Sequence, residues 1–197
     1  IMGYMFSLTI LVPSIGRIAD MFGRKKLYVS GFSLFTIASL FCALSSTGTE
    51  LLIFRMVQSV GASLMIANST AIITDAFPKG ELGKALGVNS MVVSVAAVIG
   101  PILGGFLINF GWRNIFYINI PIGIFGTFWA AVSLREMKDT NVDEKFDFSG
   151  TFTFTFGLLS LLLALTVGGF TKWLNKPVIL LFSIAMILTA FGFDHMQ

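Results

Sequence analysis

The sequence predicts an all-α integral membrane protein, and three observations lead to that fold class. Of the 197 residues, 55% are hydrophobic and 12% are charged, which is about half of the charged share of a soluble domain. The 21 Phe residues greatly outnumber the 3 Tyr residues, as suits a surface in lipid. Long apolar runs without polar alternation favour helices over barrel strands, because a helix satisfies its own backbone hydrogen bonds within lipid. The composition excludes a soluble globular domain and a disordered chain.

Seven apolar runs are candidates for helices that cross a bilayer, which takes roughly 17–25 residues each. They lie at about 1–15, 27–45, 51–73, 84–108, 115–134, 148–168 and 177–193. The first run is short and opens the chain, so we expect a fragment of a longer protein that is cut within a helix. We expect three regions: a bundle of five spans at 1–134, a charged linker at 135–147, and a further helix pair at 148–197.

The connections between these runs differ in charge on the two sides of the membrane. Nine Lys and Arg residues fall in the first, third and fifth connections, whereas three fall in the connections of the other side. The nine are Arg17, Arg24, Lys25, Lys26, Lys79, Lys84, Arg135, Lys138 and Lys145. Because short connections rich in Lys and Arg stay in the cytoplasm, we expect the first connection there and the amino end outside. Seven spans in this orientation are consistent with a helix missing upstream.

The first connection contains Gly16, Asp20, Gly23 and Arg24, followed by two lysines. Glycine permits positive φ and close approach of helices, so the two glycines predict a tight turn that they bracket. The carboxylate of Asp20 can pair with Arg24 or accept hydrogen bonds from the amino end of a neighbouring helix. The alternative is a plain turn with positive-inside charge.

Arg55 is a basic residue inside an apolar run. Helical spacing places it on one stripe with Gln58, Ser59, Ala62 and Ser63. A stripe that is first polar and then small should face protein or a watery cavity. Because an Arg at the bilayer centre costs at least about 2.5 kcal/mol, such a residue indicates function. The alternative is that Arg55 lies near the outer end of its helix and snorkels to the interface.

The run at 84–108 combines proline with small residues. It holds Gly87, Gly100, Pro101, Gly104 and Gly105. Proline inside a helix removes a hydrogen bond and produces a kink, and Gly100 with Gly104 predicts a face for tight helix packing. The alternative is a kinked helix that only packs.

The next stretch has the pattern of an interfacial anchor followed by a helix start. Trp112 and Arg113 form the anchor, and the helix start carries Asn119 and Pro121. A charged segment from Lys145 then leads into the sixth run.

These patterns together resemble the major facilitator superfamily. The loop between its second and third spans is matched by Gly16, Asp20, Gly23, Arg24, Lys25 and Leu27, with Ile18 and Met21 as departures. Its fourth span is matched by Arg55, Gln58 and Gly61, where Ser59 replaces a glycine. The antiporter motif of its fifth span is matched by Gly87, Gly100, Pro101 and Gly104, beside Gly105, where Ala96 replaces a glycine. The signature of its fourteen-span drug:proton antiporters is matched by Trp112, Arg113, Asn119 and Pro121.

The resemblance implies the amino-terminal half of a major facilitator-type helical bundle without its first span, plus two extra linking spans. In the family, the first motif latches the two halves, the fourth-span motif transfers protons or gates the cavity, and the antiporter motif helps to seal the cavity. The function implied is export of hydrophobic or cationic organic compounds by proton antiport with alternating access, in the cell membrane. Partners would be a small organic molecule, protons, the lipid bilayer and the remainder of the transporter, without nucleic acid, metal or cofactor.

The acidic residues leave the coupling ion open. All ten lie in connections or at helix ends, whereas proton coupling requires a carboxylate or His buried in the membrane. The family branch often places such an acid in the first span, so we expect it upstream; the alternative is a symporter or a uniport carrier of the same fold. An intramembrane enzyme needs a Ser/His pair, a zinc motif or paired aspartates within spans, so we expect no enzyme. A scaffold or receptor would tolerate Arg55→Ala and Pro101→Leu.

Overall fold

The computed structural model describes residues 2–134, 148–170 and 176–194, which form helices and short connections without a strand. The helices are α1 (Met2–Phe22), α2 (Arg24–Leu44), α3 (Gly48–Ala76), α4 (Leu82–Ile108), α5 (Asn114–Tyr117), α6 (Asn119–Ser133), α7 (Phe148–Phe170) and α8 (Lys176–Asp194). Each predicted run coincides with a helix, except that the fifth is divided into α5 and α6. The predicted linker lies outside the described residues. The all-α membrane class is confirmed, since α2, α3, α4 and the stretch Asn114–Ser133 are each long and apolar enough to cross a membrane.

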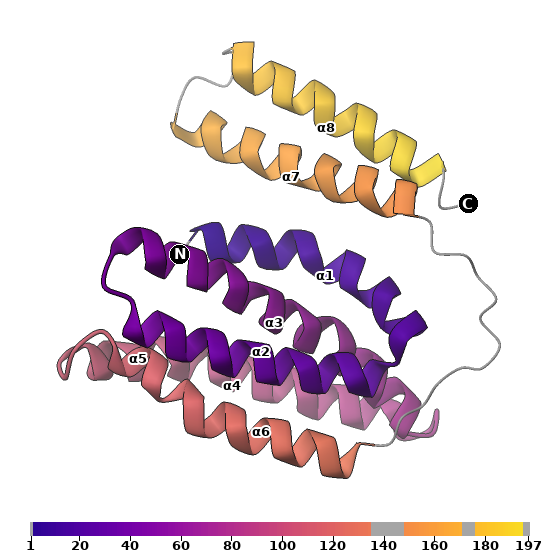
Figure 1. The fold of residues 1–197 in the computed structure, drawn as a ribbon. Helices are drawn as coiled ribbons and strands as arrows, with labels where there is room; N and C mark the ends of the chain where they lie inside the picture. Colours follow the sequence, from indigo (N-terminus) through magenta and orange to yellow (C-terminus); the bar gives the residue numbers. More distant parts are fainter. Residues whose placement is uncertain (1, 135–147, 171–175, 195–197) are drawn as a thin grey trace.

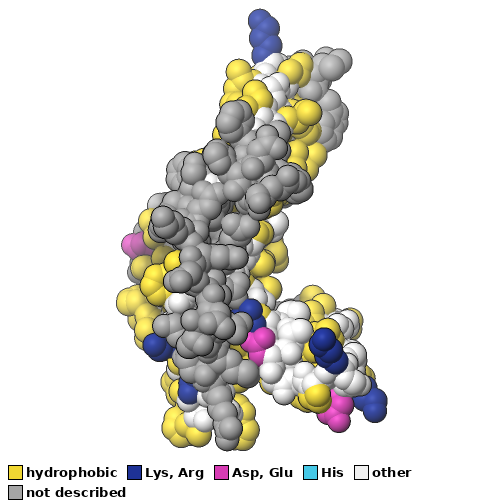
Figure 2. Space-filling view, turned by 90° about the vertical axis from the view of Figure 1, so that its right-hand side faces the viewer, with side chains coloured by type: hydrophobic (Ala, Val, Ile, Leu, Met, Phe, Trp, Pro, Cys, Tyr) yellow, Lys and Arg dark blue, Asp and Glu magenta, His cyan; other side chains and the backbone are white. Residues whose placement is uncertain are grey.

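The helices lie side by side, and successive long helices run in opposite directions (Figure 1). α2 packs against both α3 and α6, and α1 packs on α3. α7 and α8 form a hairpin that contacts the rest of the described chain through α1. We call the end where α1, α3 and α6 finish the basic end, because Arg24, Lys25, Lys26, Lys79 and Lys84 lie there. Figure 2 shows this end, with dark blue and magenta charged side chains among yellow apolar ones.

The turn between α1 and α2 consists of Gly23 alone, which corrects the prediction of a turn bracketed by two glycines. α1 continues through Gly16 as far as Phe22, and α2 begins at Arg24. Gly23 has a φ of 96°, in the left-handed region that favours glycine. Gly16 stays helical because a helix in lipid tolerates glycine when its backbone groups are satisfied within the protein.

α2 and α3 cross closely at two buried glycines, Gly31 and Gly61. A Cβ atom on Gly61 would lie 2.6 Å from the backbone N of Phe35 and 2.9 Å from the carbonyl O of Gly31. Both neighbours are backbone atoms, so they cannot rotate away as a side chain could. Because lipid provides no hydrophobic force between helices, close approach at small residues is what holds them together. The crossing therefore depends on the missing side chain of Gly61.

α6 packs on another face of α2 in a similar way. Gly123 is buried, and a Cβ atom there would collide with Oγ1 of Thr36. A Cβ atom on Gly126 would lie 2.6 Å from the ring of Phe32. Thus α2 is held on two faces by glycines of its neighbours.

The division between α5 and α6 has a local cause. Pro121 has no N–H to donate to the carbonyl of Tyr117, so the helical ladder is interrupted there. Ile118 between the two helices keeps a helical backbone, with φ −64° and ψ −28°. The two helices therefore form one apolar stretch with a break near its start.

α4 stands apart from this packing. Among the described elements it contacts α3 and α5, its neighbours in the chain, and none of its 27 residues is buried. The helix runs without interruption through Pro101. A Cβ atom would meet nothing within 4 Å, among the described residues, at Gly87, Gly100, Gly104 and Gly105.

The α7–α8 hairpin buries small residues and makes a polar contact with α1. Its buried residues include Gly157, Ser160, Ala164, Val178 and Ala185. The hydroxyl oxygens of Ser14 on α1 and Thr155 on α7 lie 2.7 Å apart. This hydrogen bond lies where the hairpin packs against α1.

Candidate functional site

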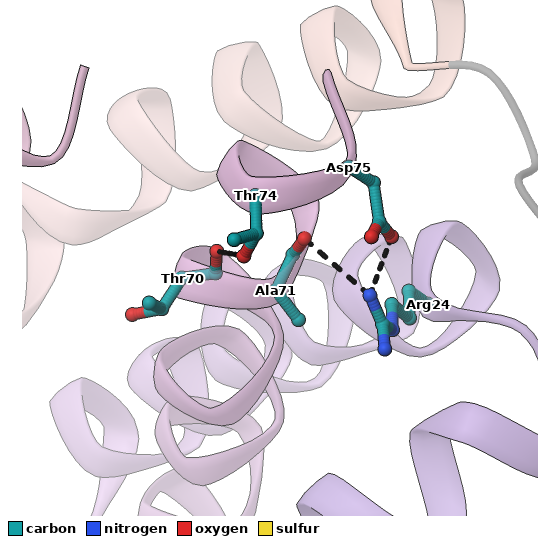
Figure 3. A network of polar contacts seen from close by, with 5 residues as sticks. All are labelled: Arg24, Thr70, Ala71, Thr74 and Asp75. Atoms are coloured by element: carbon teal, nitrogen blue, oxygen red, sulfur yellow. Dashed lines mark hydrogen bonds and ion pairs between the residues drawn. The ribbon is translucent and has the colours of Figure 1, made fainter. Parts of the chain in front are cut away.

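At the basic end, Arg24 joins the start of α2 to the end of α3 (Figure 3). Its Nη1 donates to Oδ2 of Asp75 at 2.5 Å and to the carbonyl O of Ala71 at 3.4 Å. The side chains of Arg24 and Asp75 are 25% and 31% exposed. One turn away, the hydroxyl of Thr74 donates to the carbonyl O of Thr70. Arg24 and Asp75 are 51 residues apart in sequence, so sequence analysis had no signal for Asp75 beyond its place at a helix end.

The predicted pairing of Asp20 with Arg24 stays a prediction, because the side chain of Asp20 lies outside the described residues. The Arg24–Asp75 pair borders a pocket of about 260 Å³, which also reaches Ser133 and Leu134 at the end of α6. Three helices that are separate in sequence therefore meet at this pocket. A change in the position of one of these helices would alter the distance between Arg24 and Asp75.

At the opposite end, Arg55 begins a chain of hydrogen bonds from α3 to α2. Its Nη1 donates to Oε1 of Gln58 at 2.8 Å. Nε2 of Gln58 donates to Oγ of Ser39 at 2.6 Å, and that hydroxyl donates to the carbonyl O of Phe35 at 2.7 Å. The side chains of Gln58 and Ser39 are fully buried. The polar side chains of the predicted stripe, Arg55 and Gln58, thus have hydrogen-bond partners within the protein, as burial in an apolar medium requires.

The guanidinium of Arg55 also lies between two aromatic rings. Its Cζ atom is 4.8 Å from the ring centroid of Tyr4 on α1 and 5.2 Å from that of Phe116 on α5. Ser59, Ala62 and other small residues of the stripe are buried farther along α3. Arg55 itself is half-buried. The arginine therefore contacts protein on several sides at its place within α3.

Arg113 caps the end of α2, which sequence analysis did not foresee. Its Nε donates to the carbonyl O of Ala43 at 3.1 Å, and its Nη2 donates to the carbonyl O of Ser45 at 2.9 Å. The guanidinium lies over the ring of Trp112 at 4.4 Å. Carbonyl groups at the end of a helix lack partners within the helix and carry partial negative charge, so a cation there stabilises it. The pair predicted as an interfacial anchor also joins α5 to α2.

Among the described residues, Asn119, Pro121 and the glycines of α4 have no side-chain hydrogen bond like those of Arg113. Asn119 and Pro121 lie in the first turn of α6. Between α3 and α4 there is an open cleft of about 680 Å³, lined mainly by apolar residues and reached by Asn89. The glycines and Pro101 of α4 do not line it. Their exposed face is separate from every pocket described above.

Asn68 is a fully buried amide on α3. Its Nδ2 donates to the carbonyl O of Leu64 in the same helix, at 2.7 Å. Its Oδ1 has no partner among the described residues. No group of three His, Cys, Asp or Glu residues in the described chain could hold a metal ion.

Comparison with known proteins gives a consistent result. The model of the Major Facilitator Superfamily matches residues 1–194. The chain is 37% identical over 186 residues to the multidrug transporter protein MdtP of Bacillus subtilis, a match that covers 93% of this chain and 34% of that protein. It is 36% identical over 170 residues to the riboflavin transporter RibZ of Clostridioides difficile, covering 86% and 37%. It is 32% identical over 191 residues to multidrug resistance protein 3 of Bacillus subtilis, covering 95% and 37%. The chain spans about a third of the length of these curated relatives.

Proposed function

Because the chain belongs to the major facilitator superfamily, we propose that it is the amino-terminal part of a drug exporter that works by proton antiport with alternating access. The chain is a multi-pass membrane protein, and transporters of this family are generally not enzymes. The observation that carries the proposal is the likeness to MdtP over 93% of this chain. The proposed substrates are hydrophobic or cationic organic compounds, and the proposed location is the cell membrane.

The Arg24–Asp75 pair is suited to a latch that opens and closes in each transport cycle. An ion pair exposed to water contributes about 0–1 kcal/mol, and both of these side chains are partly exposed. A movement of α2 relative to α3 can therefore break the pair at small cost. We assign the latch to Gly16, Asp20, Gly23 and Arg24, and add Asp75 as a partner of Arg24.

We assign proton transfer or cavity gating to Arg55, with Gln58 and Gly61. Support comes from the contacts of Arg55, which are an amide and two rings, whereas no carboxylate of the described residues pairs with it. A half-buried cation without a carboxylate partner can attract an acidic side chain that gains and loses a proton. We propose that this acid belongs to the remainder of the transporter.

The exposed glycine face of α4 supports a contact with the remainder of the transporter. Gly100 and Gly104 make the closest approach possible for a second helix, and nothing in the described chain occupies that space. We propose that Gly87, Pro101 and Gly105 belong to the same face. On this proposal, residues 1–134 form the amino-terminal bundle, 135–147 the linker, and 148–197 the two linking helices.

Transport by membrane vesicles tests the proposed direction and coupling. Inverted vesicles that contain the full-length protein should accumulate ethidium when a proton gradient is applied. An uncoupler should stop this accumulation, because it removes the gradient that drives exchange. The Arg55→Ala variant should insert normally and show no accumulation. Ethidium movement that ignores the uncoupler would contradict proton antiport.

A second candidate is a carrier for a metabolite, as a symporter or uniporter of the same fold. The observation that favours it is the likeness to RibZ, which is named a riboflavin transporter. Intact cells that produce the full-length protein would then take up labelled riboflavin, and cells with the Arg55→Ala variant would not. Export of ethidium without riboflavin uptake would favour the drug exporter.

A further inference from the structure

We propose that Tyr4 and Phe116 are positioning residues that hold the guanidinium of Arg55 within a continuous stack of rings and cations. We call this set, namely Tyr4, Arg55, Phe116, Trp112 and Arg113, the Arg55 stack. The inference rests on the proposed function, in which Arg55 acts on a proton or on the cavity. It connects two motifs that the sequence keeps apart, the fourth-span arginine and the Trp–Arg pair that precedes α5.

The distances place the five members in one unbroken order. The Cζ atom of Arg55 is 4.8 Å from the ring of Tyr4 and 5.2 Å from the ring of Phe116. The ring of Phe116 meets that of Trp112 edge to face, with centroids 6.2 Å apart and an angle of 87°. The Cζ atom of Arg113 lies 4.4 Å from the Trp112 ring. Each step has the geometry in which a ring attracts a cation or another ring.

Both cations of the stack are tied to α2 by hydrogen bonds. Arg55 reaches Ser39 through Gln58. Arg113 donates to the carbonyl groups of Ala43 and Ser45, at the carboxyl end of the same helix. The contacts from Arg55 to Arg113 and these bonds therefore form a closed circuit across α2, α3 and α5, and Tyr4 of α1 contacts this circuit at Arg55. A movement of Arg55 would break its contacts with Gln58, Tyr4 and Phe116.

Phe116 is the residue that connects Arg55 to Trp112 in this circuit. Its side chain is 6% exposed and packs against Cys42 and Ala43 of α2. A cation held on a ring that water cannot reach is attracted more strongly than one at an exposed ring. Phe116 also contacts both halves of the stack, Arg55 on one side and Trp112 on the other. If the Phe116 ring kept its shape but lost its attraction for Arg55, the guanidinium would be free to move while the packing around the ring stayed intact.

The alternative explanation is that Phe116 only fills space in the core, and an experiment can separate this packing role from the positioning role. A packing role requires only an apolar group of the same shape. A positioning role requires the negative face of the ring, which attracts the cation. Fluorine atoms on the ring withdraw that negative charge and leave the shape nearly unchanged. Phe116→trifluorophenylalanine is therefore the variant of choice, and Phe128 is a matched control because it is 67% exposed.

The first measurement is the rate of ethidium export by the full-length protein. We expect Phe116→trifluorophenylalanine to lower the maximal rate about fivefold with little change in the substrate concentration at half rate. The same replacement at Phe128 should leave the rate unchanged. An equal rate for the fluorinated and normal Phe116 proteins would overturn the proposal.

The second measurement does not require transport, so it separates failure of the stack from failure of the proposed function. Cys42 is fully buried against Phe116, and the full-length protein is prepared with Cys42 as its only cysteine. Fluorination at Phe116 should raise the rate of maleimide labelling of Cys42 several-fold, because the ring is held less firmly. Fluorination at Phe128 should not. If the labelling rate of Cys42 is unchanged by fluorination at Phe116, the stack does not hold the ring, whether or not the protein exports ethidium.

Tyr4 gives an independent test at the other ring. Tyr4→Phe keeps the ring and should retain export, whereas Tyr4→Leu should lower it about fivefold. In a protein that already carries Arg55→Gln, Tyr4→Leu should have no further effect on Cys42 labelling. Additive effects on labelling would count against a shared stack.

Discussion

The α2–α3 crossing and the exposed face of α4 are both built on glycine in apolar helices, yet their surroundings are opposite. At the crossing, a Cβ atom on Gly61 would strike the backbone of α2. On α4, a Cβ atom on Gly100 or Gly104 would meet nothing in the described chain. Composition does not distinguish the two helices, because α3 and α4 are both apolar enough to cross a membrane. What differs is whether a second helix lies against the glycines within the described chain.

This difference distinguishes residues that stabilise the packing of described helices from residues that have no packing partner in the described chain. α1, α2, α3 and α6 bury polar and small residues against one another, so these four helices have packing partners within the described chain. α4 buries none of its residues. A substitution at the crossing should therefore act on folding, whereas a substitution on α4 should act on assembly and transport.

The largest effect is expected at the crossing itself. Gly61→Leu places a side chain where the backbone of Phe35 and Gly31 already lies, and we expect a loss of about 3 kcal/mol in the free energy of unfolding, the upper end of the typical cost of overpacking. The variant should fail to accumulate in the membrane as a folded protein. The measurement is its thermal unfolding in detergent, beside its yield after membrane extraction.

Gly104→Leu is the matched control, because it makes the same change on α4, where space is open. In the 197-residue chain it should leave the unfolding temperature unchanged. If Gly61→Leu unfolds at the same temperature as Gly104→Leu, the proposed division between the two regions is wrong.

The next effect concerns transport without loss of folding. Pro101→Leu lies on the exposed helix, which runs through this residue without interruption. Leucine restores the missing N–H and removes the cause of a kink. We expect the full-length variant to insert and unfold normally but to confer no resistance to ethidium. Normal resistance in cells that carry the variant would show that α4 does not need its proline.

A smaller effect is expected at the basic end, because the side chains of Arg24 and Asp75 are partly exposed. Arg24→Asp should reduce export several-fold and stability by no more than about 1 kcal/mol, because exposed ion pairs contribute little to folding. The double variant Arg24→Asp with Asp75→Arg restores a pair of opposite charges. It should recover part of the lost export in the vesicle assay. No recovery would indicate that Arg24 acts without Asp75.

The sequence predicted the helices well, because the apolar runs alone decide where helices can cross a membrane. The error at Gly16 arose from treating both glycines of the charged connection as part of a turn, although of these two only Gly23 adopts positive φ. Sequence analysis gave no role to Gly31 and Gly123, where the missing side chain permits close contact between helices. Glycine in a sequence marks a possible turn or a possible crossing, and only the position of the neighbouring helix decides which.

The site was predictable in its charged residues but not in their partners. Arg55 is conspicuous because charge in an apolar run is costly, and Arg24 is conspicuous because it belongs to a charged connection between two such runs. Asp75, Ser39, Tyr4 and Phe116 carry no such signal, since each becomes significant only when another helix brings an arginine to it. Arg113 illustrates the same limit: its position suggested the interface, whereas its hydrogen bonds go to the end of α2. Long-range pairing is set by helix packing, which local patterns do not encode.

The smallest effect should arise where the α7–α8 hairpin meets α1, at a contact between two hydroxyl groups. One hydroxyl pair, Ser14 with Thr155, marks it. A hydrogen bond between helices in a membrane contributes about 0.6 kcal/mol on average, so Ser14→Ala should lower the unfolding temperature only slightly. Thr155→Val should do the same, and the double variant should cost no more than either one, because both remove one bond. Additive losses in thermal unfolding would show that the two hydroxyls act separately.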